Sequence, residues 1–299
     1  MIQSENFPLV VVTCYNHWPM LQLQAQSMQQ HLLYPTNIYV IVNEKDPTAW
    51  TVKFDKHIRH LYDGHNLTVL YHDDFDFQTA SGKRDKWGGW DDQQILKLAI
   101  AEKLDAMAYL VLDTQNFLIK SWDPNNYKII NNKIPYRTGV FVMPKQTWDS
   151  YKTVLELDIP DPNDATMAIC TPIFLRTDLI KQLIASKGGL QNFSMWFHSM
   201  PGMKSEFILY LQYAESQGGF HKTHYKTGSW GNPYLRDSEN FSSEVIKYFA
   251  ELGKFPRDKW TSINHRAWQD LDDSQCEQLT TALQSYSLTP MVELLRNRF

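Results

Sequence analysis

The fold is decided by the stretch Leu9-Val10-Val11-Val12-Thr13, a β-branched apolar run near the start of the chain. Such a run is typical of a strand that is buried on both faces, as in a parallel sheet. A polar turn and Pro19 follow, and Pro19 suits the first turn of a helix. The next apolar run, Ile38–Val42, predicts a second buried strand. Strand, helix and strand joined by short turns form a βαβ unit, so we expect the two strands to be parallel.

The same alternation continues outward from this unit. Residues Leu67–Tyr71 predict a third strand, and Gln93–Leu104 carries apolar residues at helical spacing. Tyr109–Leu112 predicts a fourth buried strand, which ends directly on Asp113. Repeated strand and helix signals of this kind predict an α/β fold with a mostly parallel central sheet flanked by helices.

Beyond about residue 120 the pattern becomes mixed α+β. Strands are predicted at Gly139–Met143, Ile173–Leu175 and Trp260–Asn264, and helices at Trp148–Leu157, Asp178–Ala185, Ser205–Gln217, Val245–Leu252 and Leu279–Gln284. No Pro-, Gly- or Ser-rich linker and no internal repeat separates the two parts. We therefore expect a single domain over residues 1–299, with a first half of residues 1–120 and a second half of residues 121–299.

Composition excludes several classes of protein. The chain has 299 residues, of which 43% are hydrophobic and 21% charged, so it is not disordered or of low complexity. Lys and Arg number 29 against 33 Asp and Glu, and this balance of −4 argues against nucleic acid as a partner. No apolar run approaches the roughly 18 residues of a transmembrane segment. Three widely spaced cysteines and a start without a basic leader predict a cytoplasmic location.

The usual nucleotide and hydrolase signatures do not occur. No Gly-x-Gly-x-x-Gly follows the first strand, no phosphate-binding loop of P-loop type is present, and no Gly-x-Ser-x-Gly elbow is present. Polar residues do follow three of the predicted strands, and ligands bind beyond the carboxyl ends of parallel strands. Asp113 is the sharpest of them, because a carboxylate there can hold a hard cation that bridges a diphosphate. The alternative is an aspartate that merely caps the next turn.

Several short motifs occur in a recognisable order. Residues Trp90–Leu98 read Trp-Asp-Asp-Gln-Gln-Ile-Leu-Lys-Leu and precede the strand that ends on Asp113. Thr171-Pro172, Ser205-Glu206-Phe207 and His265-Arg266 follow later in the chain. Over roughly residues 8–270, this order resembles nucleotide-sugar glycosyltransferases of the GT-A type, and most closely an uncharacterised bacterial and viral branch of glycosyltransferase-like proteins.

The resemblance implies a GT-A fold and the transfer of a sugar to a hydroxyl acceptor. The expected partners are a nucleoside-diphosphate sugar and a glycan or other hydroxyl acceptor, with surface glycan synthesis as a plausible setting. Residues 1–120 would form the nucleotide-binding half, and residues 121–299 the acceptor half with a C-terminal elaboration. The alternative is a catalytically inactive protein that binds a nucleotide sugar or a glycan on the same fold. A nucleotidylyltransferase is disfavoured, because no glycine-rich basic signature follows the first strand.

The resemblance also assigns roles to individual residues. The nucleotide or diphosphate would be bound by Thr13, Tyr15, Asn16, Asn43, Lys83, Arg84, Gln94, Lys97 and Arg266. Asp113 and Glu206 would be catalytic, with Glu206 as general base for the acceptor hydroxyl or as a group that orients the sugar. Four of these positions also have a simpler explanation: turn chemistry for Tyr15 and Asn16, a solvated side chain for Lys97, and helix-dipole preference for Glu206.

The expected cofactor is Mn²⁺ or Mg²⁺, with Asp113, Gln115 and His265 as ligands by resemblance. GT-A enzymes usually carry Asp-x-Asp at this strand end, whereas this chain reads Asp113-Thr114-Gln115. An amide in place of the second carboxylate lowers the affinity for a hard cation. The substitution therefore puts metal dependence, and with it activity, in question.

Overall fold

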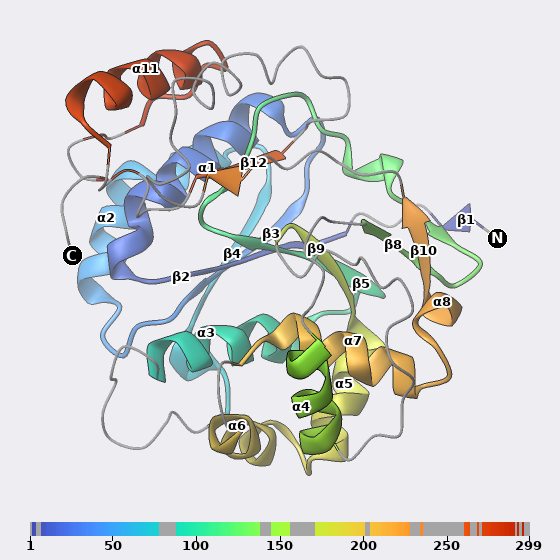
Figure 1. Cartoon of the computed structure of the whole chain (residues 1–299). Helices are drawn as coiled ribbons and strands as arrows, with labels where there is room; N and C mark the ends of the chain where they lie inside the picture. The colour runs from blue at the N-terminus through green and yellow to red at the C-terminus, as the bar shows by residue number, and fades with distance from the viewer. Residues whose placement is uncertain are drawn as a thin grey trace.

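The computed structural model describes residues 2–3, 7–77, 88–137, 145–155, 171–200, 204–227, 234–235, 260–263, 268, 271–290, 292 and 295. Its centre is a five-stranded sheet with the order β4-β3-β2-β5-β9 (Figure 1). The strands are β2 (Leu9–Thr13), β3 (Asn37–Val42), β4 (Asn66–Tyr71), β5 (Ala108–Asp113) and β9 (Ile173–Arg176). The first four pair in parallel and β9 pairs with β5 antiparallel, which confirms the predicted α/β class with a mostly parallel sheet.

Helices cover both faces of this sheet (Figure 1). One face carries α1 (Trp18–His31) and α2 (Thr48–His57). The other carries α3 (Gly88–Ala99), α4 (Lys145–Leu155), α5 (Thr177–Ser186), α6 (Leu190–Ser199) and α7 (Glu206–Ser216). The continuous apolar runs of the strands follow from this arrangement, because alternate side chains of a strand point to opposite faces and both faces are buried.

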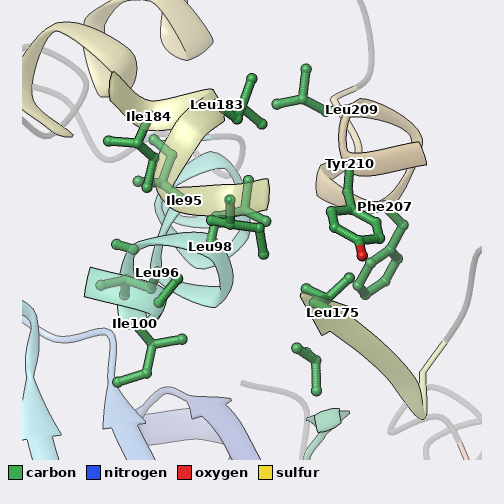
Figure 2. Close-up of a cluster of buried hydrophobic side chains, with 14 of the residues drawn as sticks. Ile95, Leu96, Leu98, Ile100, Leu175, Leu183, Ile184, Phe207, Leu209 and Tyr210 are labelled. Carbon is green, nitrogen blue, oxygen red and sulfur yellow. The ribbon is translucent and has the colours of Figure 1, made fainter. Parts of the chain in front are cut away.

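The two layers have separate hydrophobic cores. Val10 and Val12 of β2 pack with the α3 side, whereas Leu9 and Val11 of the same strand pack with the α1 side. Figure 2 shows the first of these cores, in which side chains of α3, α5, α7 and β9 point toward one another. This packing holds α3 and α7 beside each other.

The remaining strands form three smaller sheets, separate from the central one, in the described part of the chain. The strand β12 (Trp260–Ile263) pairs antiparallel with β6 (Asn116–Leu118) and parallel with β11 (Tyr234–Leu235). β10 (His224–Thr227), which follows α8 (Phe220–Thr223), pairs parallel with β8 (Ile134–Arg137), and β1 (Ile2–Gln3) pairs antiparallel with β7 (Ile129–Ile130). A third core joins α1 and β6 to β12 and α11 (Asp273–Gln284).

The sequence predicted most of these elements but not all. It did not predict α2 or α6, and α3 begins at Gly88, earlier than the predicted start at Gln93. The strand predicted at residues 139–143 and the helix predicted at residues 245–252 lie outside the described residues. Among the residues that the structure describes, no helix has both the length and the apolar character that a bilayer crossing requires.

Candidate functional site

Strand register brings the predicted polar strand ends to one edge of the sheet. Val12 pairs with Asp113, and Thr13 pairs with Val42, so the ends of β2, β3 and β5 are neighbours. The backbone N–H of Tyr15 donates to the Glu44 carboxylate at 2.7 Å. The turn after β2 is therefore tied to the end of β3, directly beside the end of β5.

The turn after β5 is shaped by buried polar side chains from distant elements. The Gln24 amide of α1 donates to the carbonyl of Asp113 at 2.8 Å and to that of Asn116 at 2.7 Å. Asn116 accepts the Asp113 N–H at 2.7 Å, and its own amide donates to the Ser262 hydroxyl at 2.6 Å. Gln24 and Asn116 are buried, so a polar group that lost one of these hydrogen bonds could not replace it with water, and the fold would be destabilised. Sequence reasoning missed this role of Gln24, since a glutamine in a polar helix carries no distinguishing pattern.

Both oxygens of the Asp113 carboxylate have partners. Oδ1 lies 2.8 Å from the Lys97 ammonium, and Oδ2 accepts the Thr171 hydroxyl at 2.8 Å. Burial by itself would raise the pKa of Asp113, but Lys97 outweighs it and lowers the pKa below its ordinary value. The side chain is still 26% exposed, so an ionised carboxylate is presented at the edge of the sheet.

Lys97 also contacts Glu206, at 2.8 Å from Oε1. The Lys97 and Glu206 side chains are only 3% and 2% exposed. The Gln94 carboxamide faces Glu206, and in the orientation that satisfies both groups its nitrogen donates to Oε1 at 2.7 Å. Burial raises the pKa of Glu206 despite the attraction of Lys97, whereas the pKa of Lys97 is raised because the two carboxylates outweigh its burial. The structure thus brings together Gln94, Lys97, Asp113 and Glu206, four of the predicted site residues.

The predicted nucleotide residues separate into two groups. Tyr15 is half-buried and Asn16 is exposed, so both are accessible beside Asp113. Thr13 and Asn43 are buried, and the Asn43 amide donates to the carbonyl of Gly89 at 2.9 Å, at the start of α3. Thr13 and Asn43 are therefore structural supports of the sheet edge and are not accessible to a ligand. Lys83, Arg84, His265 and Arg266 lie outside the described residues.

Three further side chains at this edge were not singled out from the sequence. The Lys53 ammonium of α2 lies over the Tyr15 ring, 4.5 Å from its centroid, which adds a cation beside the accessible aromatic ring. Cys14 and His17 flank the same turn. Burial alone would raise the pKa of the Cys14 thiol, but the neighbouring His17 imidazole outweighs it and holds the pKa below its ordinary value.

A second ionic cluster anchors the start of α3. Asp91 pairs with Lys204, and His198 of α6 lies 3.2 Å from Asp92 and 3.6 Å from Asp91. Burial lowers the pKa of His198, but the two carboxylates outweigh it and raise the pKa to about 9. The cluster ties α3 to α6 and to Lys204, two residues before the start of α7, and so positions the helix that carries Lys97.

Among the described residues, Asp113 and Gln115 are a poor fit to a divalent cation, and His265, the third predicted ligand, lies outside the described residues. Both oxygens of this carboxylate are already engaged, and Gln115, half-buried in the turn, offers only a neutral amide oxygen. Within the described part of the chain, no three His, Cys, Asp or Glu side chains are grouped so that they could hold a metal ion. A hard cation needs several charged oxygen ligands, which this arrangement lacks.

Comparison with protein families assigns the chain to a family. The model described as "Family of unknown function (DUF6492)" matches residues 22–258. The chain belongs to this family. No curated protein matches its sequence.

Solved structures similar to this DUF6492 chain are glycosyltransferases. The apo structure of the bifunctional glycosyltransferase WbbM has a TM-score of 0.52 at 12% identity over 96% of this chain, which spans about half (52%) of WbbM. The galactosyltransferase LgtC, in complex with donor and acceptor sugar analogues, has a TM-score of 0.51 at 12% identity, covering 95% of this chain and 98% of LgtC. An active-site mutant of LgtC matches with the same TM-score at 11% identity, over 97% of this chain and all (100%) of that one. The chain therefore has a GT-A-type glycosyltransferase fold, as the sequence resemblance implied.

Proposed function

We propose that this protein transfers a sugar from a nucleoside-diphosphate donor to a hydroxyl group of a glycan or other acceptor. The observation that supports this most is the position of Asp113. It is an ionised, partly exposed carboxylate at the carboxyl end of β5, beside the turn after β2, in a GT-A-type fold. Ligands of open α/β sheets bind at such an edge.

The edge supplies what this chemistry needs. In glycosyl transfer the acceptor oxygen bonds to the anomeric carbon, the bond from that carbon to the diphosphate oxygen breaks, and the electron pair leaves with the diphosphate. The acceptor hydroxyl gives up its proton. Fixed cations stabilise the departing charge: Lys97 contacts Asp113, and Lys53 lies over the ring of Tyr15 in the turn after β2. Tyr15 offers an accessible ring on which a nucleotide base can stack.

A binding protein without activity is the second candidate. Two observations favour it: the neutral Gln115 in place of a carboxylate, and the burial of Glu206, whose side chain is 2% exposed and in contact with Lys97. A general base must reach the acceptor hydroxyl within hydrogen-bond distance, and Glu206 does not face solvent.

A panel of nucleoside-diphosphate sugars, read out by released nucleoside diphosphate, tests the proposal. Release that depends on an added acceptor, and that is lost in Asp113→Asn but not in Asp105→Asn, supports the transferase; Asp105 is an exposed aspartate before β5. Calorimetric binding of a nucleoside diphosphate without release of product from any donor supports the binding protein. Absence of both binding and release contradicts both candidates.

We place this activity in the cytoplasm, where nucleotide sugars would reach the site without crossing a membrane.

A further inference from the structure

Lys97 is a buried cation held between two carboxylates. Its ammonium nitrogen lies 2.8 Å from Asp113 Oδ1 and 2.8 Å from Glu206 Oε1, and its side chain is 3% exposed. Removing a lysine from water is costly unless charged partners compensate it. A lysine that served only to pack α3 against α7 would gain nothing over an apolar residue, and the neighbours of Lys97 on α3 are apolar: Leu96 and Leu98 are both fully buried.

The position of the ammonium is set by three elements. Lys97 extends from α3, Asp113 ends β5, and Glu206 is the first residue of α7. Figure 2 shows Leu98 of α3 in the same buried cluster as Phe207 and Tyr210 of α7, so the apolar core holds the two helices in place. The Phe207 ring also lies beside the ammonium, with its centroid 5.2 Å away. The charge is therefore held at a fixed point next to Asp113.

That point is where a divalent cation would have to bind. A metal ion held by Asp113 needs at least one of its carboxylate oxygens. Each oxygen already has a partner, Lys97 at Oδ1 and Thr171 at Oδ2, so a metal ion would have to compete with these contacts. The rest of the turn adds only the neutral Gln115. An ammonium and a divalent cation at contact distance from the same carboxylate repel each other, so Lys97 at this point weakens the binding of a divalent cation to Asp113.

We propose that Lys97 is the resident cation of this site, and that a nucleoside diphosphate binds beside Asp113 without a divalent metal ion. Glu206 is then a positioning residue that holds Lys97, rather than the base that deprotonates the acceptor. This proposal rests on the proposed function only for the identity of the ligand. The position of Lys97 between Asp113 and Glu206 supports the assignment of the cation whichever ligand binds.

The first experiment measures the cation without any nucleotide. Mn²⁺ is titrated into the whole protein, and free Mn²⁺ is followed by electron paramagnetic resonance. We expect no stoichiometric site in the wild-type protein. Lys97→Met leaves Asp113 and Glu206 as two adjacent carboxylates, so this variant should bind Mn²⁺ at least about tenfold more tightly than the wild type. Lys103→Met, at an exposed lysine just after α3, is the matched control and should bind no more than the wild type. Stoichiometric Mn²⁺ binding by the wild-type protein that Asp113→Asn abolishes would overturn the proposal.

The second experiment measures ligand binding. UDP and GDP are titrated calorimetrically in EDTA and in excess Mn²⁺. We expect equal dissociation constants in the two buffers within about twofold, and a loss of about tenfold or more in Lys97→Met, with Lys97→Arg retaining most of the affinity because it keeps the charge. Binding that requires Mn²⁺ would overturn the proposal. If neither nucleotide binds in either buffer, the proposed function fails for these bases, and the Mn²⁺ titration alone decides the statement about the cation. The wild-type measurements need no variant to fold.

Discussion

Lys97 and Asp113 form an ion pair at 2.8 Å that joins the last turn of α3 to the carboxyl end of β5. The pair has one buried member and one member that is 26% exposed. Its position means that the charge state of the accessible carboxylate depends on a side chain that solvent hardly reaches. Changes to either residue should therefore affect stability and ligand binding together.

Lys97→Met should destabilise the protein by about 3–5 kcal/mol, because it leaves the buried Glu206 and the adjacent Asp113 without their cation. Chemical denaturation near neutral pH measures the change in the free energy of unfolding. Lys103→Met should change it by less than about 0.5 kcal/mol, since this lysine is exposed. A loss below about 1 kcal/mol in Lys97→Met would mean that the two carboxylates are not charged together in the folded state.

Asp113→Asn should lower nucleotide-sugar turnover by about 100-fold or more, because the amide accepts from the Lys97 ammonium only as a neutral group and presents no negative charge at the edge. Steady-state release of nucleoside diphosphate measures the effect. Thr171→Val is the informative companion: it removes only the hydroxyl that donates to Oδ2, so a smaller loss is expected. Full activity in Asp113→Asn would show that the active site does not lie at this edge of the sheet.

Gln115→Asp should by itself add little Mn²⁺ affinity, because Lys97 still occupies Asp113 Oδ1. Combined with Lys97→Met, it should give tighter Mn²⁺ binding than Lys97→Met alone, since three carboxylates then lie near one another. Comparing the Mn²⁺ dissociation constants of the two single variants and the double variant separates the two effects. Strong Mn²⁺ binding in the Gln115→Asp single variant would show that Lys97 yields to a metal ion.

The His198 cluster should make stability fall at alkaline pH. The folded-state pKa of His198 is raised to about 9, above its ordinary value near 6.5, by the carboxylates of Asp91 and Asp92, with Lys204 also in the cluster. The contribution is therefore complete below about pH 6.5 and is lost as the pH rises through about 9; it amounts to about 3 kcal/mol at most. Denaturation curves across this range should show the decline in the wild type and not in His198→Gln. A wild-type curve that matches the variant would contradict the assignment.

Cys14 should react with iodoacetamide near neutral pH faster than an ordinary thiol. His17 lowers the pKa of this thiol in spite of its burial, so more of it is present as thiolate. Mass spectrometry of the labelled peptides distinguishes Cys14 from Cys276, which is 3% exposed and should react slowly. His17→Gln should slow the labelling of Cys14. A bound nucleoside diphosphate should also slow it, whereas labelling unaffected by any nucleotide would place the ligand away from this turn.

The sequence was sufficient to predict the central sheet because buried parallel strands appear as uninterrupted apolar runs. It did not predict α2, since only Trp50 and Phe54 of that helix are buried and two residues make a weak periodic signal. It predicted that Asp113 ends a central strand and that Gln94 and Lys97 share a helix face. Both features depend only on the spacing of residues that are close in the sequence.

The partners of these groups could not be predicted from local spacing. The contacts of Lys97 with Glu206 and of Asp113 with Thr171 join segments that are distant in the chain, and only tertiary packing brings them together. The same holds for Gln24, whose role depends on the turn after β5 lying under α1. Burial of Glu206 is likewise a property of the α3–α7 packing and not of the motif Ser205-Glu206-Phe207.

The antiparallel pairing of β12 with β6 has a consequence for biosynthesis. Ser262, which fixes Asn116 beneath Asp113, is made long after the strands of the central sheet. On the ribosome, the segments that form β2, β3, β4 and β5 are synthesised before the hydroxyl that completes the turn. The scaffold of the carboxylate turn is therefore synthesised early and the residue that completes the turn late, so a chain that ends before residue 260 lacks the hydroxyl that accepts a hydrogen bond from the Asn116 amide.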